Sequence, residues 1–352
     1  MLHYQNLGID LAAKSFRVCL KVKNEDLSVK IKGQRKFANT PSGFEALDSW
    51  LKKKADAGLT LTVTMEATGV YYERLAYFLH GAGYKVHVLL PNRIKGYMKF
   101  LNLKSKTDKL EAKALAELGL GTKLPEWKPA SPQMYSLKRL SRERNTLKEE
   151  KTALSNRLHA EESCQKPEKL AIKRLRQRIA LIDKQVVQVE KQMHQLAAKD
   201  QELQSRIENI CKIKGVAFIT VLAVIAETNG FELVEHKSQL VSYAGYDIVE
   251  RESGSSVKGK TRISKKGNRH IRHALHFPAI SVVKYHEEFK SLYERVFDRT
   301  KVKMKGYVAV QRKLLVLIYT LYKKNMPYDP GYYKTQAVGQ NSRQDTMPAY
   351  TG

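Results

Sequence analysis

The sequence predicts an α/β domain followed by two mainly helical parts. Short strand-like and helical stretches alternate over residues 1–125, apolar residues recur at heptad spacing within residues 134–206, and helical patterns dominate residues 207–325. Alternating strands and helices are typical of a mixed sheet with helices on its faces, and heptads are typical of paired long helices. The expected fold class is therefore α/β plus all-α.

Four strands are expected in the first domain. Residues 4–11 and 16–22 are short runs joined by residues 12–15, which predicts a hairpin. Residues 60–65 predict a third strand, and residues 85–90 predict a fourth that stops at Pro91.

Three helices are expected between and after these strands, at residues 44–51, 70–80 and 106–118. The glycines at 81 and 83 would end the second helix, and Gly119 would be the C-cap of the third.

Three prolines mark the end of the first domain. Pro125, Pro129 and Pro132 lie within eight residues, and proline interrupts regular structure. We expect an α/β domain at residues 1–125, a helical segment at 126–206, a compact helical domain at 207–330, and a polar, disordered tail at 331–352.

The heptad pattern allows two structures. A chain that folds back at Pro167 would bury the apolar seam in its own helical hairpin, whereas a dimerising coiled coil would bury it between two chains. The spacing fits both, and we slightly favour the dimer contact. The seam residues are Leu140, Leu147 and Leu154 before Pro167, and Ile172, Leu175, Ile179, Ile182, Val186, Val189, Met193 and Leu196 after it.

The net charge points to a polyanionic partner. The 352 residues contain 63 Lys+Arg and 35 Asp+Glu, a formal charge of +28, which favours nucleic acid first and an acidic membrane surface second. The longest apolar run, residues 216–226, is too short for a membrane helix, which needs about 20 residues. Three separated cysteines fit neither a disulfide framework nor a zinc knuckle, so we expect a cytoplasmic protein.

Four acidic residues form a candidate metal site in the first domain. Asp10 lies inside the first apolar strand and Glu66 ends the third, where an unpaired carboxylate is costly. Asp108 and Glu111 are three residues apart on one helix face. Carboxylates from three segments are the hard oxygen ligands that Mg²⁺ prefers, as in ribonuclease-H-like nucleases. Taken alone, Asp108 and Glu111 in this lysine-rich helix are better explained as surface charges, and the case for a site rests on the four acids together.

A basic, serine-containing segment follows in the last domain. Residues 251–275 hold eight Lys+Arg and one acid, and three serines (Ser253, Ser255 and Ser256) precede most of the cations. Such a segment suits phosphate oxygens. The residues alone favour phosphate binding over a nucleophilic serine, because no neighbouring base is evident. The expected phosphate-binding residues are Lys258, Lys260, Arg262, Lys265, Lys266, Asn268, Arg269 and Arg272.

These motifs resemble one family along nearly the whole chain. The runs GID around Asp10, MEATG around Glu66, KTDKLEA around Asp108, SYAGYDIVERESGSSVKG and RISKKGN occur in the order found in transposases of the IS-one-ten group of insertion sequences, which include relatives of the Piv DNA invertase. The resemblance implies an N-terminal RuvC-like domain of RNase H fold and a C-terminal transposase domain.

The resemblance also implies chemistry and partners. Asp10, Glu66 and Asp108 match three members of the family's acidic tetrad, which binds Mg²⁺, and Glu111 stands where the fourth member is usually Asp. Ser253 matches the family's nucleophile, which would form a covalent phosphoserine with DNA. The implied partners are donor and target DNA, a guide (bridge) RNA, and further copies of the chain in a dimer or tetramer with a composite active site; no membrane partner is expected.

The sequence also fits two other functions. A Holliday-junction endonuclease of RuvC type would use the acids with water as nucleophile and would not need Ser253. A non-enzymatic nucleic-acid-binding protein would still bind after Asp10→Ala and would make no Mg²⁺-dependent product.

Overall fold

A computed structural model describes residues 4–331, except residues 103, 104, 106, 251, 254–256 and 260. The chain divides into two compact units, Met1–Pro129 and Ala130–Gly352. The helical segment expected as a separate middle domain therefore belongs to the same unit as the helices that follow it.

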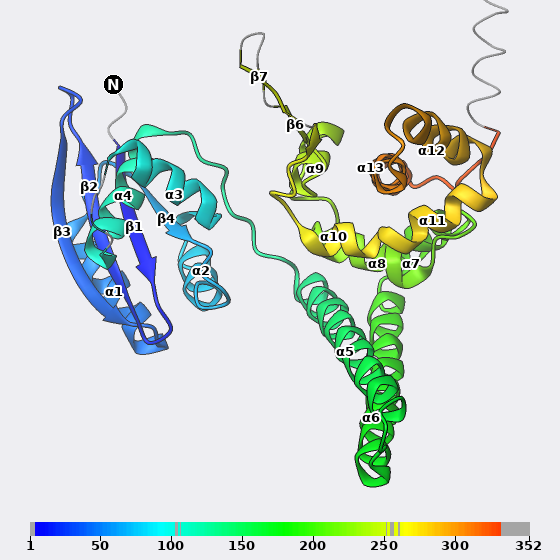
Figure 1. The fold of residues 1–352 in the computed structure, drawn as a ribbon. Helices are drawn as coiled ribbons and strands as arrows, with labels where there is room; N and C mark the ends of the chain where they lie inside the picture. Colours follow the sequence, from blue (N-terminus) through cyan, green and yellow to red (C-terminus); the bar gives the residue numbers. More distant parts are fainter. Residues whose placement is uncertain are drawn as a thin grey trace, which may run out of the picture. The chain divides into compact units, whose positions relative to one another are not determined.

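The first unit is built on a five-stranded mixed sheet, in the order β3-β2-β1-β4-β5 (Figure 1). The first three strands are antiparallel, and β4 and β5 run parallel to β1. The mixed sheet expected for an RNase H/RuvC-like domain is thus present. The strands are β1 (Tyr4–Leu11), β2 (Ser15–Lys23), β3 (Val29–Ala38), β4 (Thr60–Glu66) and β5 (Lys85–Leu89).

Helices cover both faces of this sheet. On one face, α1 (Pro41–Lys54) and α2 (Glu73–Gly81) pack against apolar residues such as Leu7, Ile9 and Met65. On the other face, α4 (Asp108–Gly121) packs against β1, β2 and β4, and α3 (Pro91–Phe100) packs beside α4. Burial of apolar side chains on both faces stabilises the layered arrangement.

Several expectations for this unit were wrong in detail. Strand β3 and helix α3 were not predicted, and α1 is longer than the expected residues 44–51. Helix α2 starts at Glu73 instead of residue 70. Gly119 is not a C-cap: it lies inside α4, whose C-cap is Thr122, and its missing side chain makes room for Asn6 and Thr64.

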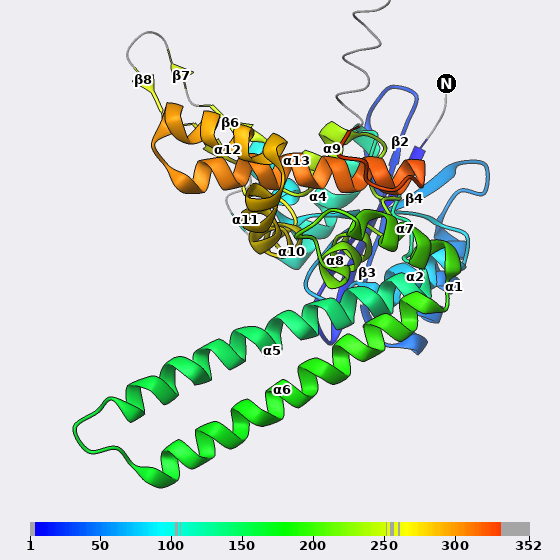
Figure 2. The ribbon, with the colours of Figure 1, turned by 90° about the vertical axis from the view of Figure 1, so that its right-hand side faces the viewer.

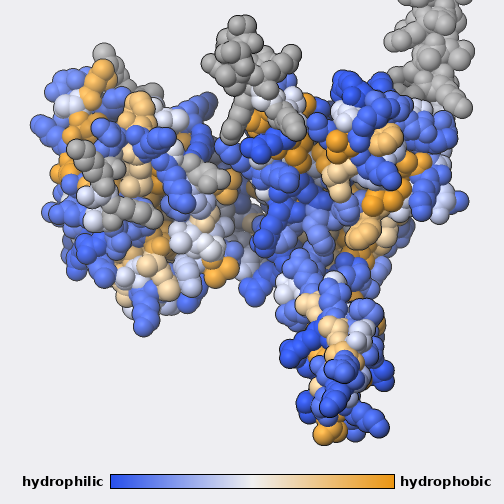
Figure 3. All heavy atoms as spheres, in the orientation of Figure 1, coloured by the Kyte–Doolittle hydropathy of each residue, from blue (hydrophilic) through white to orange (hydrophobic). Residues whose placement is uncertain are grey.

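The second unit begins with a long helical hairpin. Helices α5 (Pro132–Glu162) and α6 (Lys169–Ala198) lie side by side and project from the remaining helices (Figure 2). Pro167 lies in the turn between them, and the seam residues Leu154, Leu175, Ile182 and Val186 form one buried cluster within the chain. The heptad pattern therefore closes a hairpin of the chain on itself. Hydrophilic residues cover most of its visible surface (Figure 3).

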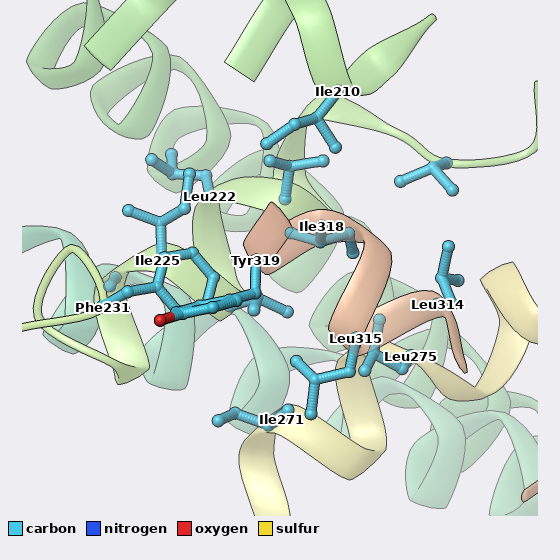
Figure 4. Packing of buried hydrophobic residues seen from close by; sticks show 14 of the residues in the cluster. Ile210, Leu222, Ile225, Phe231, Ile271, Leu275, Leu314, Leu315, Ile318 and Tyr319 are labelled. Atoms are coloured by element: carbon cyan, nitrogen blue, oxygen red, sulfur yellow. The ribbon is translucent and has the colours of Figure 1, made fainter. Parts of the chain in front are cut away.

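The rest of this unit is a helical bundle around one core. Its helices are α7 (Gln201–Cys211), α8 (Phe218–Glu227), α9 (Lys237–Tyr243), α10 (Arg269–Ala274), α11 (His276–Tyr285), α12 (Glu287–Thr300) and α13 (Lys303–Lys324). Leu222 and Ile225 of α8, Ile271 of α10, and Leu314 and Ile318 of α13 meet in that core (Figure 4). Short strands β6 (Ile248–Val249), β7 (Glu252–Ser253), β8 (Val257–Lys258) and β9 (Arg262–Ile263) lie between α9 and α10.

Candidate active site

Asp10 and Glu66 lie at matching positions near the ends of two neighbouring parallel strands. The pairing of β1 with β4 runs from Tyr4 opposite Thr60 to Ile9 opposite Met65, so each acid follows the last pair by one residue. Neighbouring strands lie about 4.8 Å apart. The two half-buried acids are therefore neighbours at the same end of the sheet.

Both acids belong to the sheet face that α4 covers. Side chains alternate between faces, so Asn6, Gly8 and Asp10 share one face. Asn6 donates hydrogen bonds to Oγ1 of Thr62 at 2.6 Å and of Thr64 at 3.0 Å, which places β4 residues of the same parity as Glu66 on that face. A Cβ on Gly8 would lie only 2.1 Å from the carbonyl oxygen of Ala112, so glycine is needed for α4 to pack directly on β1.

The direction of α4 brings its first turn to the acidic end of β1. Gly119 lies against Asn6, and Ala112 lies against Gly8, so the helix runs antiparallel to β1 and its start lies toward Asp10. Thr107 caps the helix by accepting a hydrogen bond from the Leu110 amide at 3.3 Å. The first turn carries Asp108 and Glu111.

Arg17 contacts this first turn. Its Nε lies 3.8 Å from the carboxylate of Asp108, and Arg17 is opposite Asp10 in the pairing of β1 with β2. This contact independently places Asp108 close to the Asp10 end of the sheet. The structure thus brings Asp10, Glu66, Asp108 and Glu111 to one end of one sheet face.

The donor chemistry of this end fits Mg²⁺, because three segments supply carboxylates to it and Mg²⁺ prefers such hard oxygen ligands. Among the residues that the structure describes, no three carboxylate, imidazole or thiol groups lie close enough together to hold a metal ion. Asp108 instead faces the guanidinium of Arg17. The four carboxylates would hold the ion, and a bound ion would compete with Arg17 for Asp108.

The predicted nucleophile Ser253 belongs to the other compact unit. It lies in β7, opposite Val257 of β8, and Glu252 is opposite Lys258. Strands β6 and β9 pair at the base of the same segment. The side chains of Ser253 and Lys258, and all of Ser255, Ser256 and Lys260, are outside the described residues.

The remaining predicted phosphate-binding residues divide into two groups. Arg262, Lys265, Lys266 and Arg269 are exposed, as phosphate contact requires. Asn268 and Arg272 have partners inside the unit. Asn268 caps α10 by accepting hydrogen bonds from the amides of His270 and Ile271, and Arg272 donates to the carbonyl oxygen of Ala244 at 2.6 Å.

Two glycines bring the segments around residues 245 and 267 into direct contact. Gly245 has a φ of +74°, a conformation that favours glycine. A Cβ on Gly267 would lie 2.5 Å from the Gly245 nitrogen and from the Tyr243 carbonyl oxygen. The motif residues SYAGYD and KKGN therefore form one structural element.

A buried carboxylate that the sequence did not reveal supports this element. Glu227, 1% exposed, accepts hydrogen bonds from Arg142 Nε at 2.7 Å and Nη2 at 2.9 Å, and from Asn268 Nδ2 at 2.7 Å. Burial raises the pKa of Glu227, but the hydrogen bonds and charge of Arg142, together with Asn268, outweigh burial and hold the pKa below its ordinary value. An acid at the end of the apolar run at residues 216–226 was the available signal.

Two family models match the segments that carry these sites. A model for transposases of the DEDD type of the IS110 group matches residues 7–161 and so includes all four acids. A second model, described as transposase of the IS116/IS110/IS902 family, matches residues 207–294 and so includes Ser253. The chain belongs to the IS110 family of transposases.

Curated relatives agree with this IS110 assignment. The chain is 29% identical over 329 residues to the pilin gene-inverting proteins of Moraxella lacunata and Moraxella bovis, which covers 92% of this chain and 97% of each relative. Family and relatives together indicate that this IS110 protein is an enzyme, a DNA transposase or recombinase.

Solved structures with partial similarity include T. thermophilus RuvC in complex with a Holliday junction substrate. That protein is 13% identical, covers 32% of this chain and 90% of its own, and has a TM-score of 0.23. A Ppx/GppA family protein of Aquifex aeolicus is 10% identical over 96% of this chain and 99% of its own, also with a TM-score of 0.23.

The DEDD type of the matching IS110 model suggests use of a divalent metal. The prediction that Glu111 stands at the fourth position of the pattern, where the resemblance implies an aspartate, stays a prediction. Its side chain is one methylene longer than that of aspartate, and Glu111 is half-buried in the first turn of α4. Over the described part of the chain, the helices include none with the length and apolar character needed to cross a membrane.

Proposed function

We propose that this protein excises and inserts its own insertion sequence by cutting and rejoining DNA strands with Ser253 as nucleophile and Mg²⁺ as cofactor. The observation that carries the proposal is the placement of Asp10, Glu66, Asp108 and Glu111 at one end of the sheet. The family, whose relatives include proteins named for pilin gene inversion, supports a recombinase over a plain nuclease.

In the proposed reaction, the Ser253 hydroxyl attacks a DNA phosphorus. A bond forms between Oγ and phosphorus, the bond from phosphorus to the 3′ oxygen breaks, and the 3′ oxygen takes up a proton. The serine proton passes to a carboxylate of the acidic cluster. A bound Mg²⁺ would polarise the phosphate and favour loss of that proton. After strand exchange, a 3′-hydroxyl attacks the phosphoserine and releases Ser253.

Exposed cations would stabilise the charge that develops on the phosphate. Arg262, Lys265 and Lys266 follow Ser253 within one basic segment and are exposed. Fixed cations near a developing negative charge lower the barrier. Lys258, Lys260 and Arg269 complete the phosphate-binding set that we propose.

The proposal also includes partners. The acids and Ser253 belong to different compact units, which fits a composite site assembled from the acids of one copy and the serine of another, in a dimer or tetramer. A bridge RNA would select the donor and target DNA. The exposed outer face of the α5–α6 hairpin, with Leu181 and Val187 on α6, is a candidate surface for such assembly.

A two-plasmid recombination assay in cells tests the function. One plasmid carries the element's ends and flanking RNA, and wild type is compared with Ser253→Ala and Asp10→Ala. We expect recombinant junctions from wild type alone. Junctions that survive Ser253→Ala but not Asp10→Ala would replace the serine mechanism with hydrolysis by the acidic site.

A further inference from the structure

Two cations stand beside the acidic cluster in one row across the sheet. Arg17 is opposite Asp10 in the pairing of β1 with β2, and Lys36 is opposite Arg17 in the pairing of β2 with β3. Directly opposed residues in neighbouring strands point to the same face. Because β4 lies on the other side of β1, the row continues from Asp10 to Glu66.

Contacts on both sides of the sheet confirm which face this row occupies. Arg17 reaches Asp108 of α4, so the row lies on the α4 face. Arg35, the residue before Lys36, lies over the ring of Phe37 at 5.3 Å, and Phe37 stacks on Phe16 in the core under α1. Arg35 and Lys36 are therefore adjacent cations on opposite faces of one strand.

The neighbouring cations Arg17 and Lys36 do not stabilise the fold. Like charges directly opposite each other in a sheet are destabilising. Lys36 is exposed, and the pair between Arg17 and Asp108 is long and largely exposed, so it contributes little stability. Two cations placed together at such a cost, next to carboxylates of a phosphate-cutting site, are suited to hold an anion.

We propose that Arg17 and Lys36 bind a backbone phosphate of the DNA strand whose scissile phosphate lies at the acidic cluster. The inference rests on the proposed function. Arg17 and Lys36 are one and two strand spacings from Asp10, roughly 5 Å and 10 Å. The cations therefore hold the strand close to the cut and act as positioning residues.

The adjacent cations of β3 provide a matched experiment. The full chain, as wild type, Lys36→Gln or Arg35→Gln, is titrated with a fluorescein-labelled DNA duplex in EDTA at several salt concentrations, and anisotropy is measured. Both substitutions remove one positive charge, and the two residues are adjacent in β3. We expect Lys36→Gln to weaken binding roughly five- to tenfold and to reduce the slope of log K against log salt by about 0.9, with Arg35→Gln at wild-type values.

Further arms separate positioning from a structural role. Lys36→Arg should restore the binding lost in Lys36→Gln, and Lys36→Gln should melt at the same temperature as wild type. Equal binding by Lys36→Gln and Arg35→Gln would overturn the proposal, and so would a loss confined to a labelled RNA hairpin. DNA binding is measured without recombination. If wild type gives no recombinant junctions, the proposed function fails, but the binding of the Lys36 and Arg35 variants can still be compared.

Discussion

The side chain of Glu227 shows how one buried charge links separate segments. Its carboxylate is held by Arg142 of α5 and by Asn268, the residue that caps α10. Removing one partner of a buried ion pair leaves an uncompensated charge. The network thus ties the helical hairpin to the basic segment that carries the proposed phosphate-binding residues.

Arg142→Ala is expected to destabilise the protein. A buried pair broken on one side costs 3–5 kcal/mol, and the 43% exposure of the Arg142 side chain reduces this to about 2 kcal/mol. Urea denaturation measures the change. Arg178→Ala, which removes an exposed arginine of α6, should stay within about 0.5 kcal/mol of wild type; equal losses for both variants would contradict the structural role of the network.

The lowered pKa of Glu227 predicts a loss of stability in acid. Its ordinary value is 4.5, and the folded value lies below it, so the unfolded chain takes up the proton first as pH falls. The stabilisation is therefore complete above the unfolded pKa and is lost as pH falls through the folded pKa. The free energy of unfolding, followed from pH 6 downward, should fall less steeply in Glu227→Gln; an unchanged slope would contradict this assignment.

At the residue scale, the sequence signal was strongest for the acids in strands, which the structure places on neighbouring strands, and their role as metal ligands stays a prediction. Asp10 and Glu66 interrupt apolar strands, and carboxylates rarely occupy such positions without a reason. Asn268 and Arg272 were grouped with phosphate-binding cations because charge and composition do not distinguish a solvent-facing side chain from one that bonds the backbone. The role of Ser253 stays a prediction.

Among the elements, α4 matters most for the acidic site because its close packing sets where Asp108 and Glu111 lie. Gly8→Ala would place a Cβ within 2.1 Å of the Ala112 carbonyl oxygen and 2.3 Å of the Ala116 nitrogen. Backbone atoms cannot give way as side chains can, so α4 must shift. We expect a loss of about 2–3 kcal/mol and of recombination activity.

Gly121→Ala is the control for this prediction. It lies at the end of the same helix with no atom within 4 Å of the added Cβ, and alanine favours helix by up to about 1 kcal/mol. Chemical denaturation and the junction assay should both leave Gly121→Ala at or above wild type. If Gly8→Ala matches Gly121→Ala in stability and activity, the close approach of α4 to β1 is not required for either.

Two leucines of α6 test whether the heptad seam is buried within the α5–α6 hairpin of one chain. Leu175 is buried between the two helices, whereas Leu181 is 55% exposed on α6. Leu175→Ala should cost about 2–4 kcal/mol and Leu181→Ala less than about 0.5 kcal/mol in urea unfolding. If the seam closes the hairpin within one chain, the Leu175→Ala loss will not depend on protein concentration; a dependence would indicate a contact between chains.

Element prediction failed where local signals opposed the final structure. Strand β3 is an exposed edge strand rich in lysine and arginine. Its apolar alternation covers only Val29 and Ile31, because Gly33 and Arg35 occupy the next positions of that parity. Pro91 was expected to end a strand, and it also begins α3 at a position where proline is favoured. Gly119 was interpreted as a helix end because glycine commonly ends helices, whereas here it permits contact with Asn6 and Thr64.

At the scale of the whole molecule, charge and division into two units determine how the protein meets its substrate. The formal charge of +28 favours steep salt dependence of binding to any nucleic acid. The acids lie in Met1–Pro129 and the serine segment in Ala130–Gly352. A reaction that needs both requires an acidic unit and a serine unit to meet on DNA. We propose that these two units come from different copies of the chain in an oligomer.

In the proposed reaction, Ser253 becomes covalently joined to DNA with help from the acidic cluster. The most direct measurement is mass spectrometry of protease-digested protein after incubation with element-end DNA and Mg²⁺. We predict a nucleotide-phosphate adduct on the peptide that contains Ser253, absent from Ser253→Ala and from Asp10→Ala. Cleaved DNA without any serine adduct in the wild-type protein would contradict the account.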